Sequence, residues 1–257
     1  MMPPLLWSHS MSRSATSLLA LSAILLAACE STTSVAPVSE PVLAASPNAA
    51  ATHRYEVTVT NLTTGQPLSP AVAVTHTRDF RLFSAGTAAS LGIQAIAEDG
   101  NPGVSAAELQ GRAGVFQVVT TGAPIGRIGG MPFPSTLRFE IEAAANANYF
   151  SFATMLICTN DGFGGVNAIR LPHGATTTMV YAAAYDSGTE VNDEKAGSIV
   201  PPCFGIGPVV LAGGGGNRTA EGGVVRMHPG VAGGIGDLTA AHAWTGPVAS
   251  VSIRRIR

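Results

Sequence analysis

The residues best suited to chemistry lie in one acidic stretch, AYDSGTEVNDEKAG, at residues 184–197. The chain has only 16 acidic residues, yet four of them fall within nine positions here: Asp186, Glu190, Asp193 and Glu194. Crowded carboxylates repel one another, and a divalent cation removes that repulsion. Calcium takes roughly six to eight oxygen ligands, so such a loop can hold it. The alternative is a solvated turn whose charges only aid solubility.

Other catalytic patterns are missing from the sequence. The six histidines form neither an HExxH motif nor an i,i+4 pair, and no G-x-S-x-G is present. We interpret His76 and His228 as structural hydrogen-bonding residues. A dispersed catalytic triad stays open, because the order of its members varies among folds. A formal net charge of -2 provides no basic surface, so we expect no nucleic-acid partner.

The N-terminus reads as a processing segment. Residues 11–31, MSRSATSLLALSAILLAACES, combine an early arginine, a short apolar run and small residues before Cys29. The end of this run, LAAC, resembles a bacterial lipobox, in which the cysteine is lipidated and becomes the new N-terminus. We therefore predict a signal peptide over residues 1–28, with Met11 as a plausible true start, and an ordinary secretory signal as the alternative. A lipid anchor holds a protein on a membrane surface, and Glu30 after the cysteine favours the outer membrane.

Export places the two remaining cysteines in an oxidising compartment. With Cys29 used for the lipid, Cys158 and Cys203 form an even pair, which predicts a disulfide. Two buried free thiols are the alternative. A metal site has little support because there is no CxxC spacing.

The rest of the chain divides into a tether and one domain. Residues 29–51 are rich in Ser, Pro, Ala and Thr without apolar periodicity, which is typical of a flexible linker. Residues 52–257 form the domain, and hydrophobic residues make up 46% of the chain, enough for a sizeable core.

Alternating apolar and polar residues predict strands in that domain. YEVTVTN at 55–61 and LRFEIE at 137–142 alternate with the two-residue period of a half-buried strand. Further strands are expected at YFSFATMLI, TTTMVYAAAY and VASVSIRRI. A helix is predicted over residues 87–99, with Thr87 as its cap, and a second short one near residue 105. Residues 98–101, EDGN, end the first helix in a turn or line a second acidic site. The fold class is mostly β, an antiparallel β-sandwich with one or two inserted short helices.

Five stretches together resemble the spondin N-terminal domain family, in the form found in bacterial lipoproteins. They occur in the family's order and are YEVTVTNLT (55–63), SPAVAVTHTRDFRLFSAGTAASLGIQAIAEDGN (69–101), SFATMLICTNDGFGGVNAIRLP (151–172), AYDSGTEVNDE (184–194) and HPGVAGGIGDLTAAHAWTGPVASVSIRRI (228–256). The resemblance implies an antiparallel β-sandwich similar to calcium- and phospholipid-binding sandwich domains.

The resemblance also implies a calcium site. The family's Asp-Ala-Gly-Thr-Asp segment matches residues 186–190 here, and its Asp-bearing loop matches NDGFGG at 160–165. Asp161, Asp186 and Glu190 would then be the metal ligands. Two departures stand out: Glu190 replaces an aspartate, and no tryptophan follows Asp161.

Together these features predict a non-catalytic adhesion or ligand-binding module. We expect an exported protein, anchored in the bacterial cell envelope through Cys29, with calcium as its cofactor and a protein or glycan as its ligand. An envelope hydrolase with an unrecognised site is one alternative. The other is a purely structural lipoprotein without metal.

Overall fold

The computed structural model describes residues 51–211 and 214–257. The predicted signal peptide, the predicted lipidation site Cys29 and the predicted tether up to residue 50 lie outside these residues. Within them the chain forms nine strands and three short α-helices. The strands are β1 (Thr52–Asn61), β2 (Val72–His76), β3 (Val115–Thr120), β4 (Thr136–Ala144), β5 (Tyr149–Met155), β6 (Gly162–Arg170), β7 (Thr177–Asp186), β8 (Arg226–Met227) and β9 (Ala249–Arg255). The helices are α1 (Leu91–Asp99), α2 (Pro102–Leu109) and α3 (Pro202–Ile206), with a 3₁₀ turn at Ala240–His242.

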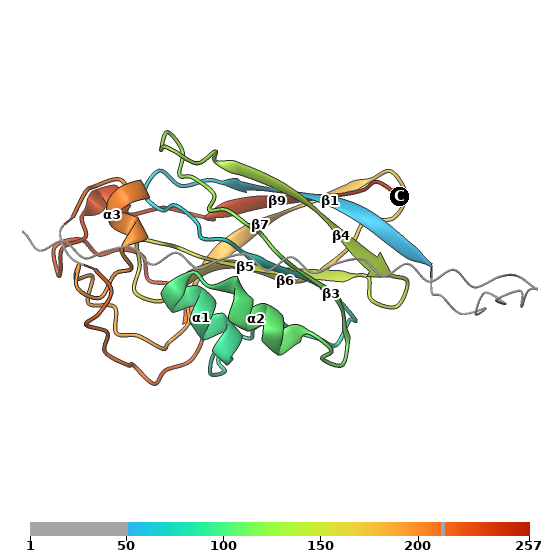
Figure 1. Ribbon diagram of the computed structural model, residues 1–257, viewed down its shortest axis with the longest axis horizontal. Helices are drawn as coiled ribbons and strands as arrows, with labels where there is room; N and C mark the ends of the chain where they lie inside the picture. The colour runs from blue at the N-terminus through green and yellow to red at the C-terminus, as the bar shows by residue number, and fades with distance from the viewer. Residues whose placement is uncertain (1–50, 212–213) are drawn as a thin grey trace, which may run out of the picture. The chain divides into compact units, whose positions relative to one another are not determined.

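All the strands belong to one antiparallel sheet, in the order β3-β2-β5-β6-β7-β9-β1-β4, with β8 added beside β7. Strand β7 is the corner of this sheet. Its first part, residues 177–182, pairs with β9, whereas residues 183–186 pair with β6. The sheet therefore folds over at β7, and β1, β4 and β9 lie in one layer above β3, β5 and β6 (Figure 1).

The two ends of the sheet, β2 and β3 at one end and β4 at the other, approach each other and nearly close it. Thr75 Oγ1 in β2 donates to the carbonyl oxygen of Glu142 in β4 at 2.6 Å. The side-chain oxygen of Gln117 in β3 accepts from the backbone N–H of the same Glu142. The prediction of a mostly β, antiparallel fold is confirmed. The two layers are, however, parts of one continuous and nearly closed sheet rather than two separate sheets, because β7 belongs to both.

One hydrophobic core fills the space between the layers. Val57 and Val59 of β1 face Phe150 and Phe152 of β5, and all four side chains are fully buried. The predicted alternation in β1 is therefore real, since the buried positions recur every second residue. Burying a large apolar side chain stabilises a fold by about 1.5–3 kcal/mol, so this core accounts for much of the domain's stability.

A second core lies on the outer face of the layer that contains β5 and β6. Helices α1 and α2 cover that face (Figure 1), and Ile93 and Ile96 of α1 pack against Val74 and Phe163. This burial on both sides explains why β2 is buried at all five positions and lacks an alternating pattern.

The helix prediction over residues 87–99 is right at its end and wrong at its start. Gly100 ends α1 in the left-handed conformation, with φ of 61°. The helix begins at Leu91, however, and its cap is Ser90, whose side chain accepts from the N–H of Ile93. The hydroxyl of Thr87 instead donates to the carbonyl of Ser84 at 2.8 Å, within a turn. The helix expected near residue 105 is present as α2.

Candidate metal centre

The sheet register places the two predicted aspartates side by side. Asp161 immediately precedes β6, and Asp186 is the last residue of β7. Gly162 pairs with Asp186 across these strands, and the N–H of Ser187 donates to the Asp161 carbonyl at 3.1 Å. Residues 25 positions apart in the chain therefore meet because two antiparallel strands end together.

The two carboxylate oxygens of Asp161 have different surroundings. Oδ2 accepts hydrogen bonds from the Ser187 hydroxyl (2.9 Å) and from the N–H groups of Thr189 (2.8 Å) and Glu190 (3.0 Å). This oxygen therefore holds the turn after β7 in place. Oδ1 is equally buried and has no hydrogen-bond partner. A buried acceptor without a hydrogen-bond partner costs about 1–3 kcal/mol of unfolding free energy. A ligand bound to this oxygen would remove that cost.

The carboxylate of Asp186 is fully buried, and both of its oxygens accept hydrogen bonds. Oδ1 accepts from the N–H of Gly188 at 2.7 Å, while Oδ2 accepts from Asn192 Nδ2 at 2.6 Å and Arg226 Nη2 at 3.0 Å. Burial raises the pKa of Asp186, and neighbouring Asp161 raises it further, against the opposing effect of its hydrogen bonds and of Arg226. The same guanidinium binds Glu221 at 2.7 Å.

Glu221 completes a group of three acidic residues. One carboxylate oxygen from each of Asp161, Asp186 and Glu221 lies within 4.8 Å of the others. This distance suits several carboxylates around one cation. Glu190, the third predicted ligand, is not part of that group.

Glu190 lies next to the group in a different setting. Its side chain is 2% exposed, and neither carboxylate oxygen has a hydrogen-bond partner. Arg218 Nε lies 3.4 Å from Oε1, which is an ion-pair distance without hydrogen-bond geometry. Burial raises the pKa of Glu190 to about 8, opposed by Arg218 and reinforced by Glu98, Asp161 and Asp193. The negative charge of this carboxylate is therefore poorly compensated by its neighbours.

The other two carboxylates of the acidic stretch hold loops together. Asp193 accepts from Asn160 Nδ2 at 3.0 Å and from the Ser198 hydroxyl at 2.9 Å. The carboxylate of Glu194 accepts from the N–H groups of Ala232 (2.6 Å) and Gly233 (2.9 Å). The acidic stretch is thus neither a solvated turn nor a single site, because Asp186, Glu190 and Glu194 are buried, Asp193 is half-buried, and the four carboxylates contact different partners.

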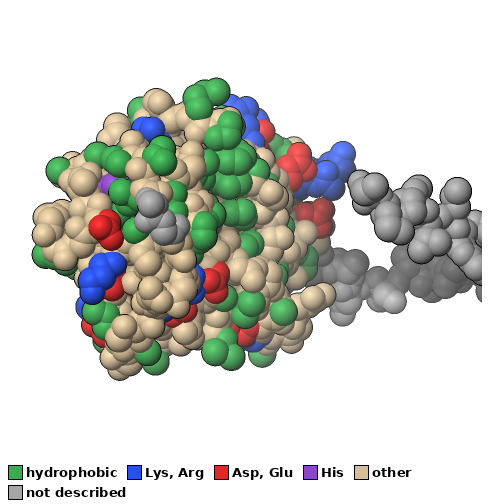
Figure 2. All heavy atoms as spheres, turned by 60° about the vertical axis from the view of Figure 1, so that its left-hand side comes forward, with side chains coloured by type: hydrophobic (Ala, Val, Ile, Leu, Met, Phe, Trp, Pro, Cys, Tyr) green, Lys and Arg blue, Asp and Glu red, His purple; other side chains and the backbone are tan. Residues whose placement is uncertain are grey.

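Sequence reasoning missed the basic residues of this region and also Glu221. Arg218 binds Asp99 at 2.7 Å, which links the turn after α1 to Glu190. Residues 98–101 end α1 in a turn, which is the first of the two predicted roles, and Asp99 and Glu98 of this turn pair with Arg218. The face drawn in Figure 2 carries acidic and basic side chains next to one another rather than charges of one sign. No sequence motif marks these partners, which lie between the acidic stretch and β8.

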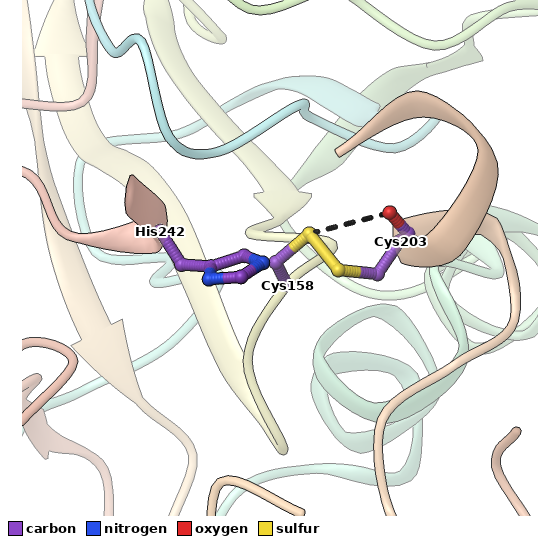
Figure 3. A group of neighbouring side chains, drawn as sticks. All are labelled: Cys158, Cys203 and His242. Atoms are coloured by element: carbon purple, nitrogen blue, oxygen red, sulfur yellow. Dashed lines mark hydrogen bonds between the residues drawn. A yellow bond between two sulfur atoms is a disulfide. The ribbon is translucent and has the colours of Figure 1, made fainter. Parts of the chain in front are cut away.

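The predicted disulfide between Cys158 and Cys203 is confirmed, with an S–S distance of 2.09 Å. Figure 3 shows His242 with its ring directed at this bridge, and His242 is fully buried. The three residues have the composition of a metal site. Bridged sulfurs cannot act as thiolate ligands, however, so this cluster is structural. It joins the loop after β5 to α3.

His76, the last residue of β2, is a structural residue, as predicted. One ring nitrogen of His76 lies 2.8 Å from the Ser151 hydroxyl, and the other lies 2.8 Å from the carbonyl of Thr77. Burial lowers its pKa. His76 therefore ties β2 to β5 as a neutral side chain.

Comparison with known proteins identifies the family. In the part of the chain that the structure describes, no helix has the length and apolar character needed to cross a membrane. No curated protein matches the chain. The Spondin_N family model matches residues 54–192, which is more than half of the 257 residues and includes Asp161, Asp186 and Glu190. The chain therefore belongs to the Spondin_N family, the family of spondin N-terminal domains.

Proposed function

We propose that this protein is a non-catalytic binding module of the bacterial cell envelope, with a calcium ion ordering the loops at Asp161 and residues 186–194. The observation that carries the metal proposal is a set of three buried carboxylate oxygens without hydrogen-bond partners: Asp161 Oδ1, Glu190 Oε1 and Glu190 Oε2. Buried charges persist only when paired or bound to metal, and a bound cation would favour the ionised form of Glu190, whose pKa burial otherwise raises to about 8. A cation there would supply the positive charge that the hydrogen-bond network lacks.

The donor set fits calcium better than other metals. All the candidate ligands are carboxylate oxygens, with Asp186 and Glu221 beside Asp161, and hard oxygen donors are the ligands that calcium prefers. Magnesium demands near-ideal octahedral geometry, which a set of loop carboxylates need not supply. Zinc favours nitrogen and sulfur. Asp161, Asp186 and Glu221 would hold the ion, with the neighbouring Glu190 as a further ligand.

The loops that the ion would order are also the ones that tie distant segments together. Asp161 binds the turn at 187–190, and Asp186 binds Arg226 of β8. Bound calcium would therefore stiffen a surface rather than activate a reaction. This is what an adhesion or ligand-binding module requires, since a pre-ordered surface loses less entropy on binding.

Isothermal titration of the full-length protein with calcium tests the metal proposal. We expect one saturable site, and Glu190→Gln should abolish it, because an amide cannot supply two anionic oxygens. Glu140→Gln is the matched control, since Glu140 is exposed and pairs only with Arg54. Equal calcium binding by Glu190→Gln and the wild type would refute the site.

The envelope location is tested through Cys29. If this residue carries the lipid, Cys29→Ser should move the protein from the membrane fraction to the soluble fraction after cell lysis. Retention of the Cys29→Ser variant in the membrane fraction at high salt would count against the anchor.

A further inference from the structure

A groove of about 650 Å³ lies on β7, where its neighbour changes from β8 to β9. On one side of the gap His228 N donates to Ala184 O at 3.1 Å, and on the other Val248 N donates to Ala182 O at 2.9 Å. Pro229 and Pro247 line the gap between them. Neither proline has an N–H to donate, so the sheet cannot close across this space and the groove remains open.

The lining of the groove is aromatic and uncharged. Tyr181 and Met227 are 62% and 61% exposed, and Trp244 packs with its ring centroid 5.1 Å from that of His228. Within residues 51–211 and 214–257, no Asp, Glu, Lys or Arg lines the groove. Burial lowers the pKa of His228 to about 4, so this ring also stays neutral at physiological pH. A charged ligand would lose its hydration here without gaining a counter-ion.

Two side chains offer hydrogen-bond donors to the groove. The indole of Trp244 is a donor only, and the hydroxyl of Tyr181 can donate. His228 Nδ1 accepts from the N–H of Gly230 at 2.9 Å, so the proton of the neutral ring is on Nε2, which is buried and not exposed to the groove. Among the described residues, no Asn or Gln side chain lines the groove either. The complementary ligand is therefore neutral, apolar on one face and rich in acceptors.

We propose that this groove binds an uncharged, proline-containing extended segment of a partner protein. Such a segment adopts a polyproline II helix, which presents apolar rings and free carbonyl acceptors and has no N–H at its prolines. Aromatic-lined grooves with indole and hydroxyl donors recognise this conformation. A neutral sugar would present hydroxyl donors as well, and the lining side chains offer few acceptors for them. The proposal rests on the proposed function, because it names the partner of a binding module.

Tryptophan fluorescence of the full-length protein tests this assignment. The chain has two tryptophans, Trp7 and Trp244, so Trp7→Phe leaves the groove residue as the only one. The probe is a blocked, uncharged nine-residue peptide of alternating alanine and proline. We expect a saturable change in Trp244 emission, both in EDTA and in calcium. The same peptide with glycine in place of proline should bind at least about tenfold more weakly, because the free chain is no longer pre-ordered.

Variants separate the groove from the rest of the surface. By fluorescence polarisation of a labelled peptide, Trp244→Ala should weaken binding about thirtyfold, as expected for an aromatic anchor. Met227→Ala should weaken it less. Met179→Ala is the matched control, since Met179 is also 61% exposed and lies on β7 outside the groove, and it should leave binding unchanged.

Three results would overturn the assignment: no binding of the proline peptide, equal binding of the glycine peptide, or a response to a neutral oligosaccharide such as chitotriose instead. Because the calcium titration does not involve the groove, these results would not refute the proposed calcium site. Loss of calcium binding with peptide binding intact would refute the ion site alone.

Discussion

Replacing Asp161 should separate two roles that its two carboxylate oxygens perform. Oδ2 accepts four hydrogen bonds from the turn after β7, the longest of them 3.3 Å from the Thr189 hydroxyl, and Oδ1 has none. In Asp161→Ala all four donors lose this acceptor. In Asp161→Asn the amide oxygen can still accept from them, while an NH₂ group that cannot bind a cation replaces the second oxygen.

The hydrogen bonds set the expected magnitudes. A buried donor left unpaired costs about 1–3 kcal/mol, and such costs are not additive. We therefore expect Asp161→Ala to lose about 3–5 kcal/mol of unfolding free energy in EDTA, a large part of the roughly 5–15 kcal/mol of a typical domain. That loss corresponds to a fall in Tm of about 6–20 °C for a domain of this size. Asp161→Asn should lose less than about 2 kcal/mol.

Calcium then distinguishes the variants. At a hundred times the dissociation constant, calcium should add about 2.7 kcal/mol to the wild type, and neither variant should gain stability. The assay is thermal and urea unfolding, followed by circular dichroism, in EDTA and in millimolar calcium. Equal losses for the two variants in EDTA would refute the role of Oδ2. A calcium-induced rise in Tm for Asp161→Asn would refute the role of Oδ1.

Three further predictions follow from other parts of the domain. Removing the disulfide with Cys158→Ala and Cys203→Ala should lower the unfolding free energy in urea by about 4 kcal/mol, since the bridge joins residues 45 positions apart; an unchanged urea midpoint would contradict this. Gly188→Ala should lower the Tm far more than Gly86→Ala. Both glycines have positive φ, but a Cβ at Gly188 would lie 2.5 Å from Val224 N, whereas a Cβ at Gly86 would face open space. Equal shifts in Tm would show that the close contact at Gly188 can relax. Burial lowers the pKa of folded His228 to about 4, below the ordinary 6.5, so its contribution to stability is present above pH 6.5 and is lost as the pH falls through 4, by up to about 3 kcal/mol. In His228→Asn the pH dependence of the unfolding free energy in urea should therefore become flatter by that amount. An identical pH profile in this variant would exclude His228 as the source of the pH dependence.

Most of the fold followed from local pattern. The alternation in β1 and β4 predicted half-buried strands, and both strands lie where it placed them. Gly100 predicted the end of α1 because left-handed backbone there costs glycine little. Pattern failed where both faces of a strand are covered, as in β2, since burial on both sides removes the alternation. It also misplaced the start of α1, because Thr87 and Ser90 are both good caps and only the turn at Ser84 decides between them.

For the candidate metal centre, the sequence by itself determined which carboxylates are clustered, and elsewhere in the domain it determined the cysteine pair. Both are features of composition and spacing, and they are readable without coordinates. Only the tertiary structure decided which oxygens remain unpartnered, that Glu221 joins Asp161 and Asp186, and that Arg218 pairs with Glu190 while Arg226 pairs with Asp186. The groove beside β8 likewise depends on Met227, His228 and Trp244 meeting across a break in the sheet. The physical reason is that charge compensation and cavities arise from contacts between distant segments, and spacing along one strand or loop does not encode those contacts.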